Sequence, residues 1–190
     1  MENTLITYLK SFGPVPETDY QLILDAFEMK SYQEGEVLFE SGRICNDFYF
    51  INKGILMIAA NNELGNHVTH YFLKEHHFCT VLFSYVNQVR AEVNIEAACD
   101  VEVMQTKRIK LLQLYDKLPY LRDLVEQILQ QNLMEKIQNN NAYQGHDSTA
   151  RYKLFLALQP EVAARVSLGN IASYLRITQQ SISRIRKNMH

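Results

Sequence analysis

Apolar residues recur at different spacings along this chain, and the spacing divides it into regions. Residues 3–11 and 17–29 carry apolar positions three and four apart, which predicts two helices that flank a sheet. From residue 30 to about residue 106, short apolar or alternating runs are separated by turn sequences such as Lys53-Gly54, which predicts antiparallel strands in a sandwich or barrel. The expected strands are Val37–Phe39, Phe48–Ile51, Ile55–Ile58, Val68–Leu73, Val93–Ala98 and Val101–Thr106.

A long helix is expected over residues 117–138, beginning near Pro119. Its apolar stripe is wide enough to meet both the preceding strands and a second copy of the chain, and a helix packed only on its own domain is the alternative. Asn132 continues the stripe, where it either fixes the register of a helix pair or is solvated. The apolar residues of the stripe are Leu118, Leu121, Val125, Ile128, Leu129, Leu133 and Ile137.

The next segment, residues 139–149, is polar and poor in helix-forming residues, which is typical of a hinge. Ser148 or Thr149 is expected to cap a following helix over residues 150–158. That helix directs its aromatic residues toward a C-terminal core and ends at Pro160-Glu161.

Two short amphipathic stretches predict a helix-turn-helix over residues 166–189. Ser167 is expected to cap the first helix, and Thr178 the second, after the short connection that begins at Arg176. Because this turn often has positive φ, Arg176 occupies a place that favours glycine, at a cost of about 1 kcal/mol. The residues expected to face the core are Ile171, Tyr174, Leu175, Ile182, Ile185 and Met189.

The outer face of the second helix is polar and basic, and its residue types suit contacts with duplex DNA. In a helix lodged in the major groove, the N-terminal side chains meet base edges. Gln can pair with adenine and Arg with guanine, whereas Ser reaches a base edge or a phosphate and Lys reaches a phosphate. The candidate DNA-binding residues are Thr178, Gln179, Gln180, Ser181, Ser183, Arg184 and Lys187.

Charge is distributed unevenly along the chain. The net charge is −2, but residues 151–190 contain seven Lys and Arg residues against the single acidic residue Glu161, whereas the preceding part contains 12 basic against 20 acidic residues. A basic tail is the electrostatic footprint of phosphate binding, and a solvated helical pair at a chain end is the alternative. We therefore expect a transcription factor whose partner is double-stranded DNA.

Length and composition limit the number of domains and the kind of protein that this chain can form. With 190 residues and 47% hydrophobic content, the chain can form one domain or two small ones. No apolar run approaches the roughly 20 residues of a membrane span, and the N-terminus lacks a signal-peptide pattern, so we expect a cytoplasmic protein with no membrane contact. Cys45, Cys79 and Cys99 are widely separated, which indicates isolated core thiols rather than disulfides or a zinc site.

Several short motifs follow one another in an order that is fairly specific although each is weak alone. The motifs are Glu34 to Phe39, Gly42, Asp47 to Gly54, Ile95-Glu96-Ala97, Asp100 to Val103, Pro119-Tyr120-Leu121, Asn170 to Leu175 and Ser181 to Ile185. The earlier ones look like the cyclic-nucleotide-binding β-roll. Together, from about residue 32 to residue 187, they resemble the family of the cAMP receptor protein and the fumarate-nitrate regulator, the Crp/Fnr family.

The resemblance implies an α+β chain with four parts. Residues 1–116 form an antiparallel β-roll of the cyclic-nucleotide-binding-like jelly-roll type, with flanking helices. Residues 117–138 form a dimerisation helix, residues 139–149 a hinge, and residues 150–190 an all-α helix-turn-helix domain. It also implies a sequence-specific transcriptional regulator, a homodimer through residues 117–138 that binds an inverted repeat, with RNA polymerase as a further partner. We expect no cofactor, no metal and no enzymatic activity.

The residues that hold the nucleotide phosphate in the resembled family are not matched here. That family uses a Gly-Glu pair and, further along, an Arg-Ser or Arg-Thr pair. At these places the chain has Cys79-Thr80 and Ala91-Glu92, and Arg90 is shifted to the opposite face of its strand. Because a buried phosphate without a guanidinium partner is unfavourable, we expect cAMP binding to be absent or weak, and the effector to be an unknown small molecule or none.

Other sensing chemistries have little support in the sequence. His67, His70, His76 and His77 lie around a predicted strand without a carboxylate at ligand spacing, so solvated or core histidines are expected rather than a metal or haem site. Cys79 is expected to be a packed, inert thiol, with a redox-sensitive thiol as the alternative.

The sequence ends at His190, directly after the second helix, so the β-hairpin wing of the resembled family is expected to be missing. Phosphate contacts are then expected from Arg151, Lys153, Arg165 and Arg186. Two other functions stay open, namely a regulatory or protein-interaction module without specific DNA binding, and a β-roll metalloenzyme. No catalytic motif supports the enzyme, and the polar, basic second helix favours DNA binding over both.

Overall fold

Antiparallel strands form two four-stranded sheets in residues 3–188, the part of the chain that the computed structural model describes. The strand order is β1-β8-β3-β6 in one sheet and β2-β7-β4-β5 in the other. The strands, together called the roll, are β1 Glu28–Tyr32, β2 Val37–Phe39, β3 Asp47–Lys53, β4 Leu56–Asn61, β5 His67–Leu73, β6 Phe78–Cys79, β7 Asn94–Ala97 and β8 Val101–Lys107.

Strand β3 is buried on both faces, which explains its uninterrupted apolar run. Successive side chains of a strand point to opposite faces. Phe48 and Phe50 pack into a cluster with the N-terminal and central helices, whereas Tyr49 and Ile51 pack between the two sheets. The roll therefore has one core inside it and a second core beneath the helices.

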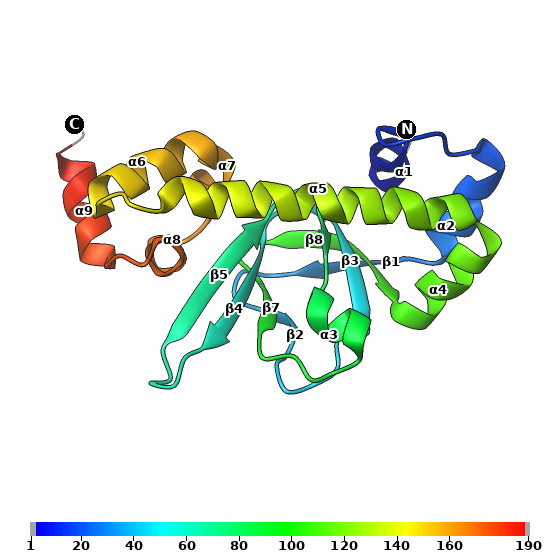
Figure 1. Ribbon diagram of the computed structural model, residues 1–190, viewed down its shortest axis with the longest axis horizontal. Coiled ribbons are helices and arrows are strands. Elements are labelled where there is room, and N and C mark those ends of the chain that lie inside the picture. Colours follow the sequence, from blue (N-terminus) through cyan, green and yellow to red (C-terminus); the bar gives the residue numbers. More distant parts are fainter. Residues whose placement is uncertain (1–2, 189–190) are drawn as a thin grey trace.

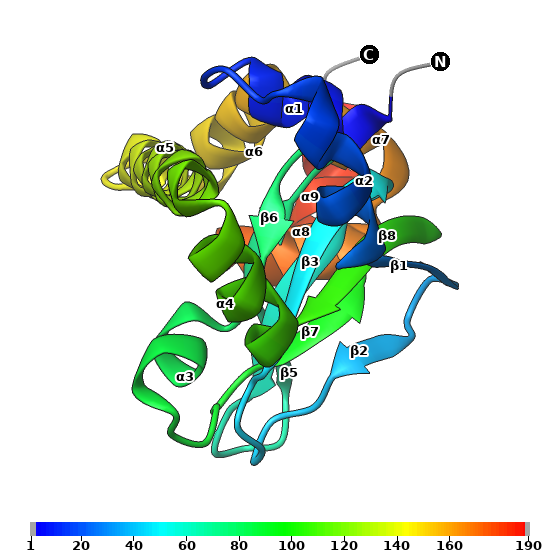
Figure 2. The ribbon, with the colours of Figure 1, turned by 90° about the vertical axis from the view of Figure 1, so that its right-hand side faces the viewer.

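The helix α5 (Pro119–Tyr143) runs along one side of the roll and connects both ends of the molecule (Figure 1). Figure 2, in which α5 is viewed nearly end-on, shows the strands on one side of this helix. Pro119 occupies the first helical position, where its missing N–H is harmless. The smaller helices around the roll are α1 Thr4–Lys10, the 3-10 turn η1 Glu17–Asp19, α2 Tyr20–Asp25, α3 Leu82–Asn87 and α4 Arg108–Lys117.

Four further helices form the C-terminal part of the molecule. Their buried residues, which include Phe155 and Ile182, belong to the same apolar cluster as Met57 and Phe72 of the roll. These helices are α6 Ser148–Leu158, α7 Pro160–Arg165, α8 Leu168–Leu175 and α9 Gln179–Lys187. Of these helices, α8 packs directly against β5, where Tyr174 contacts Phe72.

The α+β class and the antiparallel roll are confirmed, and all six expected strands are present within a few residues of their predicted bounds. The prediction of a helix over residues 17–29 was wrong at its end. It stops at Asp25, because Glu28–Tyr32 pairs with β8 as β1, which the sequence did not reveal. The strand β6 and the helix α4 were also missed.

The expected bounds near the hinge need correction. Helix α5 continues to Tyr143, so residues 139–143 are helical although they are rich in Asn. Burial of Tyr143 against the C-terminal helices explains the extension. Asp147, rather than Ser148 or Thr149, caps α6, because its carboxylate accepts the Ala150 N–H at 2.8 Å. Pro160 begins the additional helix α7. The expected core position Met189 lies outside the described residues.

Candidate nucleic-acid interface

Local sequence signals set the geometry of the two C-terminal helices α8 and α9. The Ser167 hydroxyl accepts the Asn170 N–H at 3.3 Å, and the Thr178 hydroxyl accepts the Ser181 N–H at 3.1 Å, so both expected caps are present. Between them, Arg176 has φ 55°, the left-handed conformation expected at this turn. Ile171, Leu175, Ile182 and Ile185 are buried in the shared cluster.

The outer face of α9 is exposed, and six of the seven candidate DNA-binding residues line one shallow, concave surface. Ser181 lies apart from them, because it is half-buried and its hydroxyl is 2.9 Å from the Thr178 hydroxyl in the cap. Within residues 3–188, neither Arg184 nor Lys187 forms an ion pair with a carboxylate. The residues of this surface, called the α9 face below, are Thr178, Gln179, Gln180, Ser183, Arg184 and Lys187.

The basic residues expected to contact phosphates differ in their surroundings. Arg186 donates to the Tyr152 hydroxyl at 2.6 Å, and Arg151 donates to the Leu175 carbonyl at 2.9 Å. Arg165 pairs with a carboxylate of the roll through both terminal nitrogens. Of the four, Lys153 is exposed and has no such described contact, and the phosphate contacts of all four stay a prediction.

The C-terminal helices are fastened to the roll by polar contacts as well as apolar ones. Arg165 donates to the two Glu75 oxygens at 2.5 and 2.7 Å, and the Gly54 N–H donates to Glu75 at 2.7 Å. The hydrogen bonds from Arg165 lower the pKa of Glu75 to about 2. On α8, the Ser173 hydroxyl accepts the Thr69 N–H of β5 at 2.9 Å. The sequence carried no local signal for these pairings.

Apolar packing fills the places expected for a nucleotide phosphate. Cys79, Thr80 and Ala91 are buried, whereas Arg90 and Glu92 are exposed, so the five residues do not form one site. The fully buried Tyr49 stands in the same cluster as Cys79 and Ala91, and its hydroxyl donates to a carbonyl of β2 at 3.1 Å. Burial raises the pKa of the Cys79 thiol well above its ordinary value, as expected for a packed thiol.

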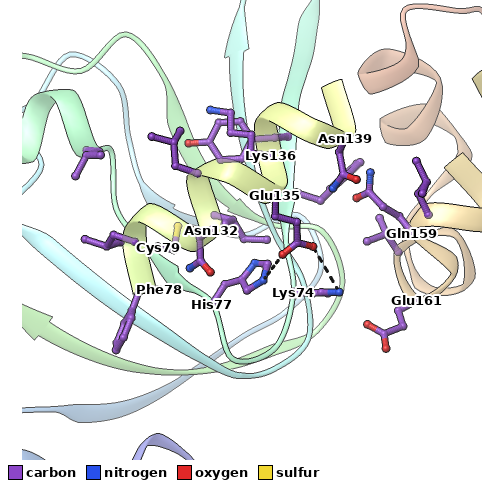
Figure 3. Close-up of a pocket in the computed structure, with 18 of the residues that line it drawn as sticks. Lys74, His77, Phe78, Cys79, Asn132, Glu135, Lys136, Asn139, Gln159 and Glu161 are labelled. Atoms are coloured by element: carbon purple, nitrogen blue, oxygen red, sulfur yellow. Dashed lines mark ion pairs between the residues drawn. The ribbon is translucent and has the colours of Figure 1, made fainter. Parts of the chain in front are cut away.

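A cavity of about 420 Å³ lies between β5, β6, α5 and the connection from α6 to α7 (Figure 3). At its wall, the His77 Nε2 is 3.4 Å and the Lys74 Nζ is 3.7 Å from oxygens of Glu135. The hydrogen bond from His77 lowers the pKa of Glu135. Asn132 also lines this cavity, and its side-chain nitrogen is buried without a described partner.

Two further histidines contact neighbouring side chains. His67 is 2.9 Å from a Glu96 oxygen, and His76 stacks on the Tyr8 ring with a centroid distance of 5.7 Å. Across residues 3–188, no group of three or more His, Cys, Asp or Glu residues could hold a metal ion. No helix in that part of the chain is long and apolar enough to cross a membrane.

The chain is similar to a known domain family and to several solved structures. Residues 29–117 match the cyclic nucleotide-binding domain family. No curated protein sequence matches the chain. Among solved structures, the c-di-GMP responsive global regulator CLP of Xanthomonas campestris has a TM-score of 0.71 at 16% identity, with 92% of this chain and 91% of that chain covered.

Two further solved structures share the fold over most of both chains. FixK2 from Bradyrhizobium japonicum has a TM-score of 0.70 at 16% identity and covers 86% of this chain and 84% of its own. A crp/fnr family transcriptional regulator from Eubacterium rectale has a TM-score of 0.69 at 15% identity, covering 92% and 83%. The class is therefore a roll, a long helix and a helix-turn-helix in one chain. Residues 29–117 thus match the cyclic nucleotide-binding domain family, and the chain shares the fold of these three solved structures, one of which is a regulator of the crp/fnr family.

Proposed function

We propose that this chain is a sequence-specific, DNA-binding transcriptional regulator of the Crp/Fnr type. The observation that carries the proposal is the α9 face, where amide, hydroxyl and cationic side chains are exposed together. Such groups match the donors and acceptors of base edges and phosphates in the major groove. The fold supports the same conclusion, since its structural neighbours include regulators.

The regulator acts as a homodimer through α5. Leu121, Val125 and Ile128 are buried on the chain's own domain, whereas Leu133 and Ile137 are 46% and 44% exposed. The apolar stripe is thus only partly covered by its own domain. A second copy that covers the exposed part would place two α9 helices on one inverted repeat, whose half-sites are about 34–36 Å apart or a multiple of that.

Cyclic AMP does not control this regulator. Packing around Tyr49, Cys79 and Ala91 fills the interior of the roll, and among residues 3–188 no arginine is buried beside them to neutralise a phosphate. Calorimetric titration of the purified protein with cAMP should show no saturable binding, and a micromolar dissociation constant would contradict the proposal.

Selection of bound duplexes from a random DNA pool tests the central proposal. We expect an enriched inverted repeat with the purified protein, at fixed moderate salt and without added ligand. Binding that falls with salt but enriches no sequence would mean that the α9 face is a nonspecific basic surface.

Two variants separate base contacts from phosphate contacts. Arg184→Ala should reduce discrimination between the selected repeat and a scrambled duplex by about 1–3 kcal/mol, whereas Lys187→Ala should weaken binding to both duplexes alike. Lys110→Ala, on the exposed surface of α4, is the control and should leave both affinities unchanged. Fluorescence anisotropy with both duplexes measures these affinities. A uniform loss in Arg184→Ala would refute its role in base contacts.

A further inference from the structure

A second cavity, of about 580 Å³, lies where β5, the end of α5, the start of α6 and the turn after α8 meet. Figure 1 shows α6 and α8 on either side of the C-terminal part of α5, with β5 the nearest labelled strand. Five of its lining residues are basic or can carry a positive charge, and none is acidic. The five, called the basic cavity residues, are His70, Lys136, His146, Arg151 and Arg176.

The basic cavity residues have no compensating negative charge within residues 3–188, because no described ion pair includes any of them. The Lys136 ammonium lies over the Tyr71 ring, 3.4 Å from its centroid. Arg151 bonds only to backbone carbonyls. Partial burial and the charges of Lys136 and Arg176 lower the pKa of His70. The charges of Lys136 and Arg176 therefore lie near His70 in a partly buried space and favour its neutral form, and an anion that enters this space would be stabilised by both cations.

The rest of the lining suits an organic molecule rather than a bare ion. Tyr71, Tyr143 and Tyr174 contribute aromatic surface, and Asn140 and Gln144 contribute amide groups. The volume lies within the range of about 300–1,000 Å³ that is typical of small-molecule sites. The combination fits a molecule that carries several negative charges on a compact polar or aromatic body.

We propose that this cavity binds a soluble small molecule with at least two negative charges, carried as phosphate or carboxylate groups. The site shares no residue with the α9 face and none with Cys79, Thr80 or Ala91. It is thus separate from the α9 face and from the expected nucleotide-phosphate positions, and it shares Arg151 with the residues expected to contact DNA phosphates.

A ligand in this cavity would join three parts of the molecule. His70 belongs to the roll, Lys136 to α5, and Arg176 to the turn that leads into α9. Since the cavity exists only while these parts are packed together, the anion stabilises this arrangement over any other. Resting on the proposed function, this makes the bound anion a determinant of how the α9 faces of a dimer are spaced.

Direct binding to the full chain tests the site without DNA. Isothermal titration with sodium pyrophosphate, at constant ionic strength and pH 7, should give a saturable isotherm. Lys136→Gln and Arg176→Gln should each weaken binding by roughly tenfold, because each removes one charge-assisted contact. The matched control Lys110→Gln, exposed on α4, should bind like the parent. Circular dichroism confirms that all variants are folded.

Three outcomes would overturn the proposal. The first is an isotherm that does not saturate at millimolar pyrophosphate, and the second is an equal loss of affinity in the control variant. The third is displacement of pyrophosphate by a random duplex, together with a matching loss of duplex binding in Lys136→Gln. The last outcome would assign the cavity to the DNA backbone instead of a soluble ligand. Since pyrophosphate binding is measured without DNA, it stands or falls independently of sequence-specific DNA binding.

Discussion

Replacing Glu75 by Gln removes one charge from the contact that fastens α7 to the roll. In the parent, the carboxylate accepts two hydrogen bonds from Arg165 and one from the Gly54 N–H. The amide keeps one oxygen, so it can still accept from Gly54, but it cannot accept both bonds from the guanidinium. The substitution therefore tests the ion pair and leaves the side-chain volume almost unchanged.

The pKa of Glu75 sets the upper bound of the effect. Its decrease from 4.5 to about 2 corresponds to about 3 kcal/mol at 1.36 kcal/mol per pKa unit. The Glu75 and Arg165 side chains are 23% and 36% exposed, however, and solvent reduces the strength of such pairs to about 1 kcal/mol or less when they are fully exposed. We therefore expect Glu75→Gln to lower the free energy of unfolding by about 1–2 kcal/mol at pH 7.

The sign of the pH dependence follows from the lowered pKa. A carboxyl group with a lower pKa in the folded state stabilises the fold above its unfolded pKa, and this contribution is lost as the pH falls through the folded value. The difference between parent and Glu75→Gln should thus be constant above about pH 5 and shrink between about pH 4 and pH 2. Urea unfolding followed by circular dichroism measures it at each pH.

Glu92→Gln is the control, because this carboxylate is exposed in the segment before β7 and forms no described ion pair. Its effect should stay within about 0.5 kcal/mol. Equal stabilities of the two variants at pH 7, or a difference that does not shrink in acid, would refute the assignment of the pKa shift to the contact with Arg165.

Two further predictions concern the roll and the dimer. Gly54→Ala should destabilise the fold by about 3 kcal/mol or more in urea unfolding, because the new Cβ would clash with the Asp100 carbonyl oxygen. Gly65→Ala, also at positive φ but with open space around it, should cost about 1 kcal/mol. Similar losses of stability in the two variants would show that the positive φ, rather than the clash, causes the destabilisation. Ile137→Asp should convert the dimer to a monomer in analytical ultracentrifugation, while Ile109→Asp, on exposed α4, should not. A dimer in both variants would exclude this part of α5 from the interface.

The helix-turn-helix could be predicted from sequence because its determinants are local. Ser167 and Thr178 are three residues from the N–H groups that they accept, and the buried positions follow helical spacing. The strand β1 could not be predicted in the same way. Its residues are largely exposed and polar, and pairing with β8, 69 to 77 positions later in the sequence, makes them a strand. A pairing between distant parts of the sequence thus makes these residues a strand, and no local pattern reveals it.

The end of α5 shows a tertiary contact overriding local preference. Three consecutive asparagines at residues 139–141 are weak helix formers, yet the helix passes through them. Tyr143 explains the result, since its ring packs at 85° against Tyr174 and its hydroxyl accepts a hydrogen bond from Gln159. These partners come from α8 and from the junction of α6 and α7, so no pattern within residues 117–149 could reveal them.

The two proposed functional surfaces also differ in how far the sequence predicts them. The α9 face comes from one short stretch of ten residues, so its members could be named from the sequence, and only Ser181 lies apart from the rest. The basic cavity residues are contributed by β5, α5, α6 and the turn after α8. Each of them looks like an ordinary solvated charge in the sequence, and only the fold brings the charges together.

The Ser173 hydroxyl links α8 to β5 of the roll through two hydrogen bonds, and removing it tests this contact. Its hydroxyl accepts the Thr69 N–H at 2.9 Å and lies 3.3 Å from the His67 carbonyl oxygen, to which it donates. Ser173→Ala leaves the N–H without a partner in a partly buried interface, at a cost of about 1–3 kcal/mol. The amide should then exchange its hydrogen roughly five- to a hundredfold faster, if exchange there follows opening of the contact between α8 and β5. Ser183→Ala, whose hydroxyl bonds only within α9, is the control and should leave this amide unchanged. Hydrogen exchange of the peptide that contains Thr69 measures both variants, and equal exchange rates would show that α8 is held by its apolar contacts alone.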